Sequence, residues 1–131
     1  MYRWVEHTAE LELAIEAASE EDVFADALAA YAELVGPAPE GETAVHSVEA
    51  EAPDPAALLA AWLEELVFLA ETEAFVPERA EIALRPGGLH ARVTGRRGDP
   101  PHIVKAVTYH DLEFSLSPAG RGWRARVVLD V

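Results

Sequence analysis

Lys105 is the single lysine of a chain whose other nine basic residues are all arginines. It lies in the stretch VKAVTYHDLEF (residues 104–114), whose apolar and β-branched residues favour a strand. A basic side chain that only has to reach solvent from a strand can equally be an arginine. A compact ammonium group, in contrast, can contact a carboxylate or a phosphate without the planar fork of arginine. We therefore interpret Lys105 as a candidate for an amine-specific contact, with chance retention as the alternative.

Thr108, Tyr109 and His110 follow Lys105 closely and add two hydroxyl groups and an imidazole. The imidazole suggests a general base. However, no serine or cysteine nucleophile motif accompanies it, the five histidines include no pair four residues apart, and no glycine-rich phosphate loop is present. The residues alone therefore show none of the common signatures of nucleophilic, zinc-protease or phosphate-loop enzymes. A metal-dependent phosphoesterase or nucleotide enzyme with His7 and His110 as acid and base stays open as an alternative.

The C-terminal stretch ARVVLDV places Asp130 beside the α-carboxylate of Val131. Two neighbouring oxygen anions repel each other unless a cation or a hydrogen-bond donor lies between them. Hard oxygen ligands suit Ca²⁺, Mg²⁺ or Mn²⁺. These residues are candidate metal ligands, and a frayed, solvated terminus is the alternative.

The stretch EHTAEL near the N-terminus contains His7, Thr8 and Glu10, which we expect in the turn between two strands. Loops of this kind often carry functional side chains. Alternatively, Thr8 caps the turn and His7 is a structural imidazole. Glu10 becomes a metal ligand only if the fold brings it to the C-terminal strand.

The charge of the chain, −14 in total, is distributed unevenly. All but five of the 24 acidic residues lie in residues 1–78, which contain one basic residue, Arg3. Nucleic acids are bound through clustered Lys and Arg, so direct RNA binding is not expected. A cation or a basic protein partner would be attracted. The alternative is that the acidic residues only keep the protein soluble.

Length and composition predict one domain over residues 1–131, with half of the residues apolar and available for a core. The chain has no cysteine, which excludes disulfides and thiolate metal sites. No apolar stretch approaches the roughly 20 residues that a membrane span needs. The N-terminus lacks the basic head and apolar middle of a signal peptide. We expect a cytoplasmic protein without membrane contact.

The elements that must position these residues follow from periodicity. Residues 2–6 and 11–17 are strand-like, and the latter alternate apolar and polar side chains. Ser19 is a predicted N-cap of a helix that stops at Gly36, and Asp54 caps a second helix after a further strand. Five short strand-like stretches follow, separated by Pro- and Gly-rich turns. The order ββαβα plus about five strands predicts an α+β fold, with two helices packed on a largely antiparallel sheet.

Four stretches together resemble the archease family: HTAE, WLEELVFLAETEAF, VKAVTYHDLEF and the closing WRARVVLDV. The resemblance covers nearly the whole chain. Archeases are small acidic α+β proteins that assist the RtcB-type RNA ligase. That ligase joins RNA 3′-phosphate or 2′,3′-cyclic phosphate ends to 5′-hydroxyls after GTP- and metal-dependent guanylylation of a histidine. The resemblance implies a protein cofactor for ligase activation and multiple turnover in tRNA splicing or RNA repair, and not an enzyme.

By the same resemblance, the metal ligands of the family fall on Glu10, Asp130 and Val131, and its required lysine falls on Lys105. Glu10 stands where the family usually has Asp, and Glu12 replaces a usual glycine. We expect His7, Thr8, Glu10, the Lys105 strand and the C-terminus to converge into one acidic tip. This tip would hold a divalent cation and contact the ligase through a set of residues that also includes Thr108, Tyr109 and His110. An acidic, chaperone-like interaction module is a further alternative.

Overall fold

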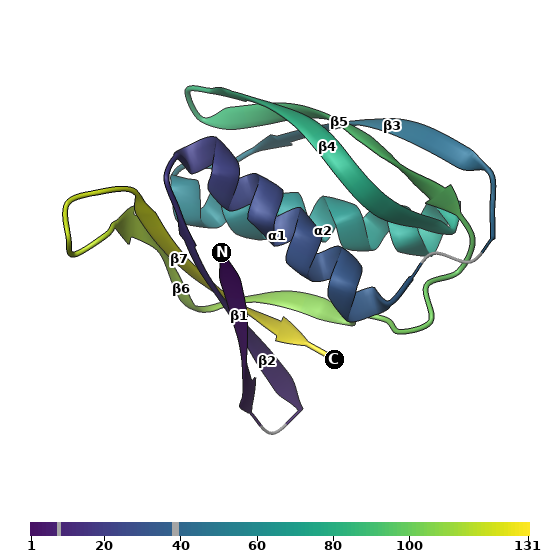
Figure 1. Cartoon of the computed structure of the whole chain (residues 1–131), viewed down its shortest axis with the longest axis horizontal. Helices are drawn as coiled ribbons and strands as arrows, with labels where there is room; N and C mark the ends of the chain where they lie inside the picture. The colour runs from purple at the N-terminus through teal and green to yellow at the C-terminus, as the bar shows by residue number, and fades with distance from the viewer. Residues whose placement is uncertain (8, 38–39) are drawn as a thin grey trace.

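The computed structural model (Figure 1) describes residues 1–7, 9–37 and 40–131, and His7 through its main chain. Its elements in chain order are β1 (Tyr2–His7), β2 (Glu10–Ala17), α1 (Glu20–Val35), β3 (Thr43–Glu51), α2 (Pro55–Glu73), β4 (Phe75–Arg85), β5 (Gly88–Arg97), β6 (Ala106–Leu116) and β7 (Trp123–Asp130). Two helices and mostly antiparallel strands confirm the α+β class.

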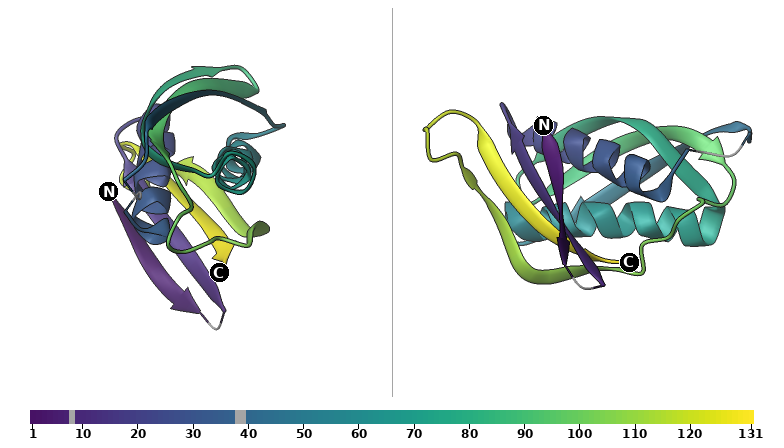
Figure 2. Two further views of the ribbon diagram at one scale, coloured as in Figure 1. Left: turned by 90° about the vertical axis from the view of Figure 1, so that its right-hand side faces the viewer. Right: turned by 60° about the horizontal axis from the view of Figure 1, so that its bottom comes forward.

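The strands form two sheets, and the helices lie between them. One sheet has the order β1-β2-β7-β6 and the other the order β3-β5-β4, as Figure 2 shows from two sides. Sequence alone suggested one sheet, because alternation reveals the two faces of a strand but not its partners. Four strands follow α2 instead of five, since most of VKAVTYH and of LEFSLS belongs to one strand, β6.

Both helices begin where local chemistry predicts, and α1 also ends there. The Ser19 hydroxyl accepts from the main-chain N–H of Asp22 at 3.1 Å, and a carboxylate oxygen of Asp54 accepts from Ala57 at 2.8 Å. Such caps satisfy donors that the first helical turn leaves free. α1 stops at Gly36, whose φ of 92° is open to glycine and strained for other residues.

The core lies between the helices and the inner faces of the two sheets. The largest fully buried side chain is Trp62 of α2, whose indole N–H donates to the carbonyl of Phe24 in α1 at 3.0 Å. Leu13 of β2 and Val127 and Leu129 of β7 also point into this core. Because side chains alternate along a strand, the even-numbered residues of β2 and β7 lie on the outer face.

Strand β6 contains an irregular segment, and its pairing with β7 resumes beyond that segment. Its pairing with β7 shifts register between Thr108 and Glu113, and Asp111 takes a φ of 56° within this segment. Asp tolerates that left-handed conformation better than most residues. The bulge therefore bends β6 while the strand keeps the same neighbour on both sides of it.

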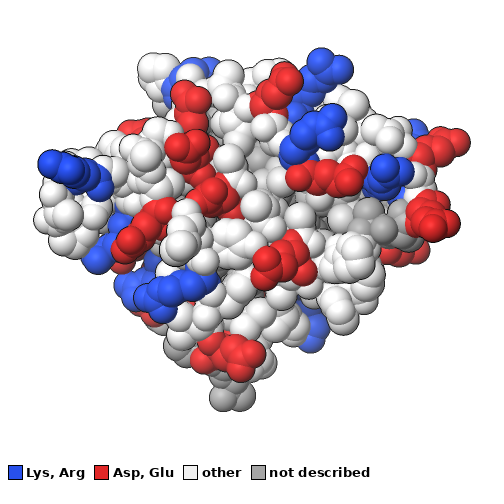
Figure 3. Space-filling view, viewed as in Figure 1, with Lys and Arg blue, Asp and Glu red and all other residues white. Residues whose placement is uncertain are grey.

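Charged side chains of both signs occupy the surface. In the view of Figure 3, acidic side chains cross the middle of the face, and an acidic group lies near the bottom. Among the described residues no polar or charged residue is fully buried. None of the helices in the described ranges has the length and apolarity to cross a membrane.

Candidate functional site at the end of the four-stranded sheet

Glu10 and Asp130 face each other across two neighbouring strands. They are direct partners in the antiparallel pairing of β2 with β7, and both are half-buried. Their neighbours Leu11 and Leu129 also pair, and Leu129 is fully buried in the core. The two carboxylates therefore share the outer face of the sheet. The expected meeting of the N-terminal turn with the C-terminal strand is confirmed.

The turn between β1 and β2 is also hydrogen-bonded to the last residue of the chain. Ala9, with a φ of 59°, accepts a long main-chain hydrogen bond of 3.5 Å from the N–H of Val131. Figures 1 and 2 show the C-terminus beside the β1-β2 hairpin. Thr8 lies outside the described residues. His7 pairs with Glu10 through its main chain, and its side chain is likewise outside the described part.

Lys105 lies next to this carboxylate pair through its backbone. Its N–H donates to the carbonyl of Asp130 at 2.8 Å, and the following residue, Ala106, pairs with Asp130 in the sheet. Lys105 thus immediately precedes β6, whereas the sequence suggested that it lies within the strand. Its side chain is exposed, and no described acidic group forms an ion pair with it.

The residues after Lys105 are divided between the two faces of the sheet. Thr108 pairs with Val128, and its buried hydroxyl oxygen has no hydrogen-bond partner among the described residues. Tyr109, 56% exposed, donates from its hydroxyl to Glu64 of α2. That hydrogen bond, partial burial and the charge of Glu64 raise the pKa of Tyr109 to about 12. Tyr109 therefore contacts the helix and not the carboxylate pair.

His110 is not brought to the carboxylates. It lies on the bulged segment of β6, and its Nε2 is 3.2 Å from Oδ2 of the neighbouring Asp111. β1, which carries His7, and β6 are opposite edges of the four-stranded sheet. With about 4.8 Å between neighbouring strands, their main chains are roughly 14 Å apart. The geometry thus disfavours the acid–base pair of His7 and His110.

The donor set at this sheet end suits a hard divalent cation in part. Glu10 and Asp130 supply two facing carboxylates, and a cation between them would relieve their mutual repulsion. No three His, Cys, Asp or Glu side chains gather closely enough for a metal site in the described part of the chain. Further ligands would have to be main-chain or carboxyl oxygens, such as those of Val131, and water.

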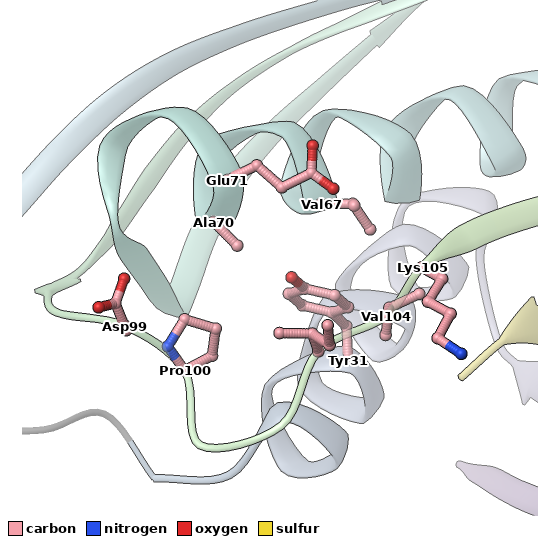
Figure 4. A pocket seen from close by; sticks show the side chains of 9 residues that line it. Tyr31, Val67, Ala70, Glu71, Asp99, Pro100, Val104 and Lys105 are labelled. Atoms are coloured by element: carbon pink, nitrogen blue, oxygen red, sulfur yellow. The ribbon is translucent and has the colours of Figure 1, made fainter.

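Beside Lys105, the structure forms a hollow of about 460 Å³ that sequence reasoning missed. We name it the α2–loop hollow; its lining residues are Tyr31, Val67, Ala70, Glu71, Asp99, Pro100, Ile103, Val104 and Lys105. Burial and the charge of Glu71 raise the pKa of Tyr31 to about 12. In Figure 4 the Lys105 amine points away from the carboxylates of Glu71 and Asp99. The only sequence signal was the apolar Ile103, two residues after a pair of prolines.

A second missed feature is an ionic network farther along the outer face. Arg126 lies 3.3 Å from Glu113 and 3.8 Å from Glu12, and Arg124 lies 3.1 Å from Glu113. Both arginines thus lie beside Glu113, and Arg126 also lies near Glu12, which is two residues from Glu10. The Glu10–Asp130 pair itself has no such basic partner among the described side chains.

Comparisons of the sequence with known proteins give the same family over nearly the whole chain. A family model described as the Archease protein family (MTH1598/TM1083) matches residues 2–131. The chain is 33% identical to an archease of Pyrococcus abyssi and 34% identical to one of Thermococcus gammatolerans, each over 100% of both chains.

Two solved structures have the same fold. The solution structure of protein 1598 from Methanobacterium thermoautotrophicum superposes with a TM-score of 0.74 at 29% identity, covering 99% of this chain and 98% of that one. The crystal structure of an archease from Thermotoga maritima, described as a possible chaperone, gives a TM-score of 0.71 at 21% identity, covering 100% and 98%. The chain belongs to the archease family.

Proposed function

We propose that this archease activates an RtcB-type RNA ligase by promoting its metal- and GTP-dependent guanylylation and its multiple turnover in tRNA splicing or RNA repair. The partner in this proposal is the ligase protein in the cytoplasm, and the archease binds no RNA directly. Catalysis belongs to the ligase. The archease supplies charged groups to its activation step.

One observation carries the proposal: two facing carboxylates and the backbone of the unique lysine meet at one end of a sheet. Glu10 pairs with Asp130, whose carbonyl accepts from the N–H of Lys105. By the sequence resemblance, these are the positions that correspond to the functional residues of the family. Glu10, Asp130 and the carboxyl oxygens of Val131 would hold the divalent cation, Ca²⁺, Mg²⁺ or Mn²⁺, which would supply positive charge at this tip.

Lys105 has the clearest assignment within this proposal. Its backbone is held by the hydrogen bond to Asp130, while its amine forms no ion pair with a described residue. An amine of this kind is free to contact an anionic group of the partner, such as a GTP phosphate. Thr108, Tyr109 and His110 lie beyond it on β6; the exposed Tyr109 and His110 would extend the contact surface, whereas the Thr108 hydroxyl is buried.

The test is single-turnover guanylylation of the cognate ligase with and without the archease. A lost charge-assisted contact of about 1.5–3 kcal/mol corresponds to roughly a tenfold to hundredfold loss of stimulation for Lys105→Ala. Lys105→Arg should restore little, because the contact is amine-specific in this proposal. Arg121→Ala, an exposed basic position in the distant β6-β7 turn, is the matched control.

Asp130→Ala should also reduce stimulation, because it removes one of the two facing carboxylates. Wild-type stimulation by both Lys105→Ala and Asp130→Ala would refute the assignment of these residues. Turnover of phosphoesters or nucleotides by the archease alone would favour the stand-alone enzyme instead. If combined Glu→Gln changes in the helices abolish stimulation of the ligase while Lys105→Ala still stimulates it, the acidic interaction module would be favoured.

A further inference from the structure

The α2–loop hollow has a buried apolar floor and an exposed rim. Tyr31 and Val104 are almost fully buried at its base, at 1% and 4% exposure. Val67 and Glu71 of α2 form one wall, and the β5–β6 loop with Ile103 forms the other. A volume of about 460 Å³ lies within the range of about 300–1,000 Å³ of binding pockets in proteins. The hollow can therefore accept one or two apolar side chains of a partner.

Apolar surface continues outward from the hollow on both walls. Ile103 is 67% exposed, and Phe68, the residue after Val67 on α2, is 57% exposed. Glu64, Val67, Phe68 and Glu71 lie at helical spacing and therefore share one face of α2. Large exposed apolar side chains next to a hollow are typical of binding surfaces.

The loop wall is fixed before any partner binds. The N–H groups of Gly98, His102 and Lys105 donate to carbonyls of three different segments, those of Ala74, Val35 and Asp130. Two consecutive prolines, at positions 100 and 101, restrict the loop further. The exposure of Ile103 is thus built into the fold. A preformed wall lowers the entropy cost of binding.

The rim of the hollow is acidic. Glu71 and Asp99 are exposed at the rim, and neither forms an ion pair with a described basic residue. The amine of Lys105 points away from both carboxylates (Figure 4). Two uncompensated carboxylates above an apolar floor complement an apolar side chain with a Lys or Arg nearby, and they repel phosphates.

We propose that the α2–loop hollow docks a segment of the partner ligase in which an apolar side chain fills the hollow and an adjacent Lys or Arg pairs with Glu71 and Asp99. This inference rests on the proposed function and names where the ligase is held. The hollow then sets affinity, while the neighbouring sheet end with Lys105, Glu10 and Asp130 acts on the ligase. Lys105 lies at the border of the two surfaces.

Two measurements on the same full-length variants test this inference: the dissociation constant for the cognate ligase by calorimetry, and stimulation of guanylylation at saturating archease. Ile103→Ser and Glu71→Lys change the apolar wall and the acidic rim. Leu116→Ser, 61% exposed at the far end of β6, and Glu73→Lys, exposed two residues further along α2, are the matched controls. Circular dichroism checks that each variant is folded.

Altering a side chain at the centre of an interface commonly lowers the affinity about tenfold or more. Both hollow variants should therefore raise the dissociation constant by at least this factor. The controls should bind like the wild type, and saturating stimulation should be retained. Wild-type binding by both hollow variants, with stimulation intact, would overturn the docking site and leave the proposed function standing. Binding that depends on the hollow without any stimulation would support docking and contradict the proposed function. Absence of any binding to the ligase would overturn both.

Discussion

The facing carboxylates of Glu10 and Asp130 make a quantitative prediction about stability. They are direct cross-strand partners on one face of the sheet, and no described basic side chain pairs with either. Asp130→Asn removes one charge and hardly changes the shape of the side chain. Because like charges directly opposite each other destabilise a strand pair, the variant should be more stable than the wild type when no divalent cation is present.

The magnitude follows from Coulomb's law. Side chains directly opposite in an antiparallel pair have Cβ atoms about 5 Å apart. Two unit charges about 6 Å apart repel each other by about 0.7 kcal/mol in water, so removing one should raise the free energy of unfolding by about 0.5–1 kcal/mol. For a chain of this length such a change shifts the melting temperature by about 2–4 °C.

The assay is thermal unfolding by circular dichroism in chelator at low salt. The higher melting temperature of Asp130→Asn should disappear at 1 M salt, where the Debye length falls to about 3 Å. Added Ca²⁺ or Mn²⁺ should stabilise the wild type, by about 2.7 kcal/mol at a hundredfold excess over the dissociation constant, and should stabilise Asp130→Asn much less. Glu10→Gln should be stabilised as much as Asp130→Asn. The double variant should be no more stable than either single variant, because one substitution already removes the repulsion.

Glu81→Gln is the control, because Glu81 pairs across strands with Arg92 and its loss should slightly destabilise the protein. Equal or lower stability of Asp130→Asn in chelator and low salt would refute the idea that the two carboxylates repel each other. A response to divalent cations equal to that of the wild type would show that the cation is not held by Asp130.

Three further predictions concern the scaffold. Asp54→Ala should lower the free energy of unfolding by about 1 kcal/mol, since the N–H of Ala57 loses its acceptor; an unchanged urea midpoint would contradict the cap. Gly95→Ala should cost about 2 kcal/mol or more in urea unfolding, because its Cβ would lie 2.1 Å from the carbonyl oxygen of Val76; a variant as stable as the wild type would refute this close approach. The pKa of Tyr31 is raised from 10.0 to about 12, so the stability linked to it is present below pH 10 and lost as the pH rises through 12. In Tyr31→Phe this part of the alkaline loss should be missing from unfolding free energies measured between pH 9 and 12, and an identical pH profile would contradict it.

Local chemistry predicted the helices well and the sheets only in part. The caps at Ser19 and Asp54 and the stop at Gly36 act through neighbours in sequence, so they can be recognised without the fold. The strand β6 was predicted as two strands, because its centre looks like a turn. In the structure Asp111 absorbs the irregularity with a positive φ, and pairing with β7 resumes beyond it.

The meeting of Glu10 with Asp130 has no local signal, because they lie at opposite ends of the chain. Only the pairing of β2 with β7 places them opposite each other, and family resemblance was the sole guide to it. The α2–loop hollow is harder still to predict. Its floor and walls come from α1, α2 and the β5–β6 loop, and apolar residues such as Val67 and Ile103 look like ordinary core positions in sequence.

The backbone and the side chain of Lys105 behave differently, and this difference bears on its role. A structural lysine near Glu71 and Asp99 would be expected to pair with one of them, because both carboxylates line the same hollow. Instead, its N–H is fixed by Asp130 while its amine points away from the hollow. The fold thus sets the position of the Lys105 backbone relative to Asp130, while the exposed amine has no ion-pair partner among the described residues. If the proposed function and the proposed docking site are both correct, changes in the hollow alter the archease concentration that half-saturates the ligase, and changes at Lys105 alter the maximal stimulation.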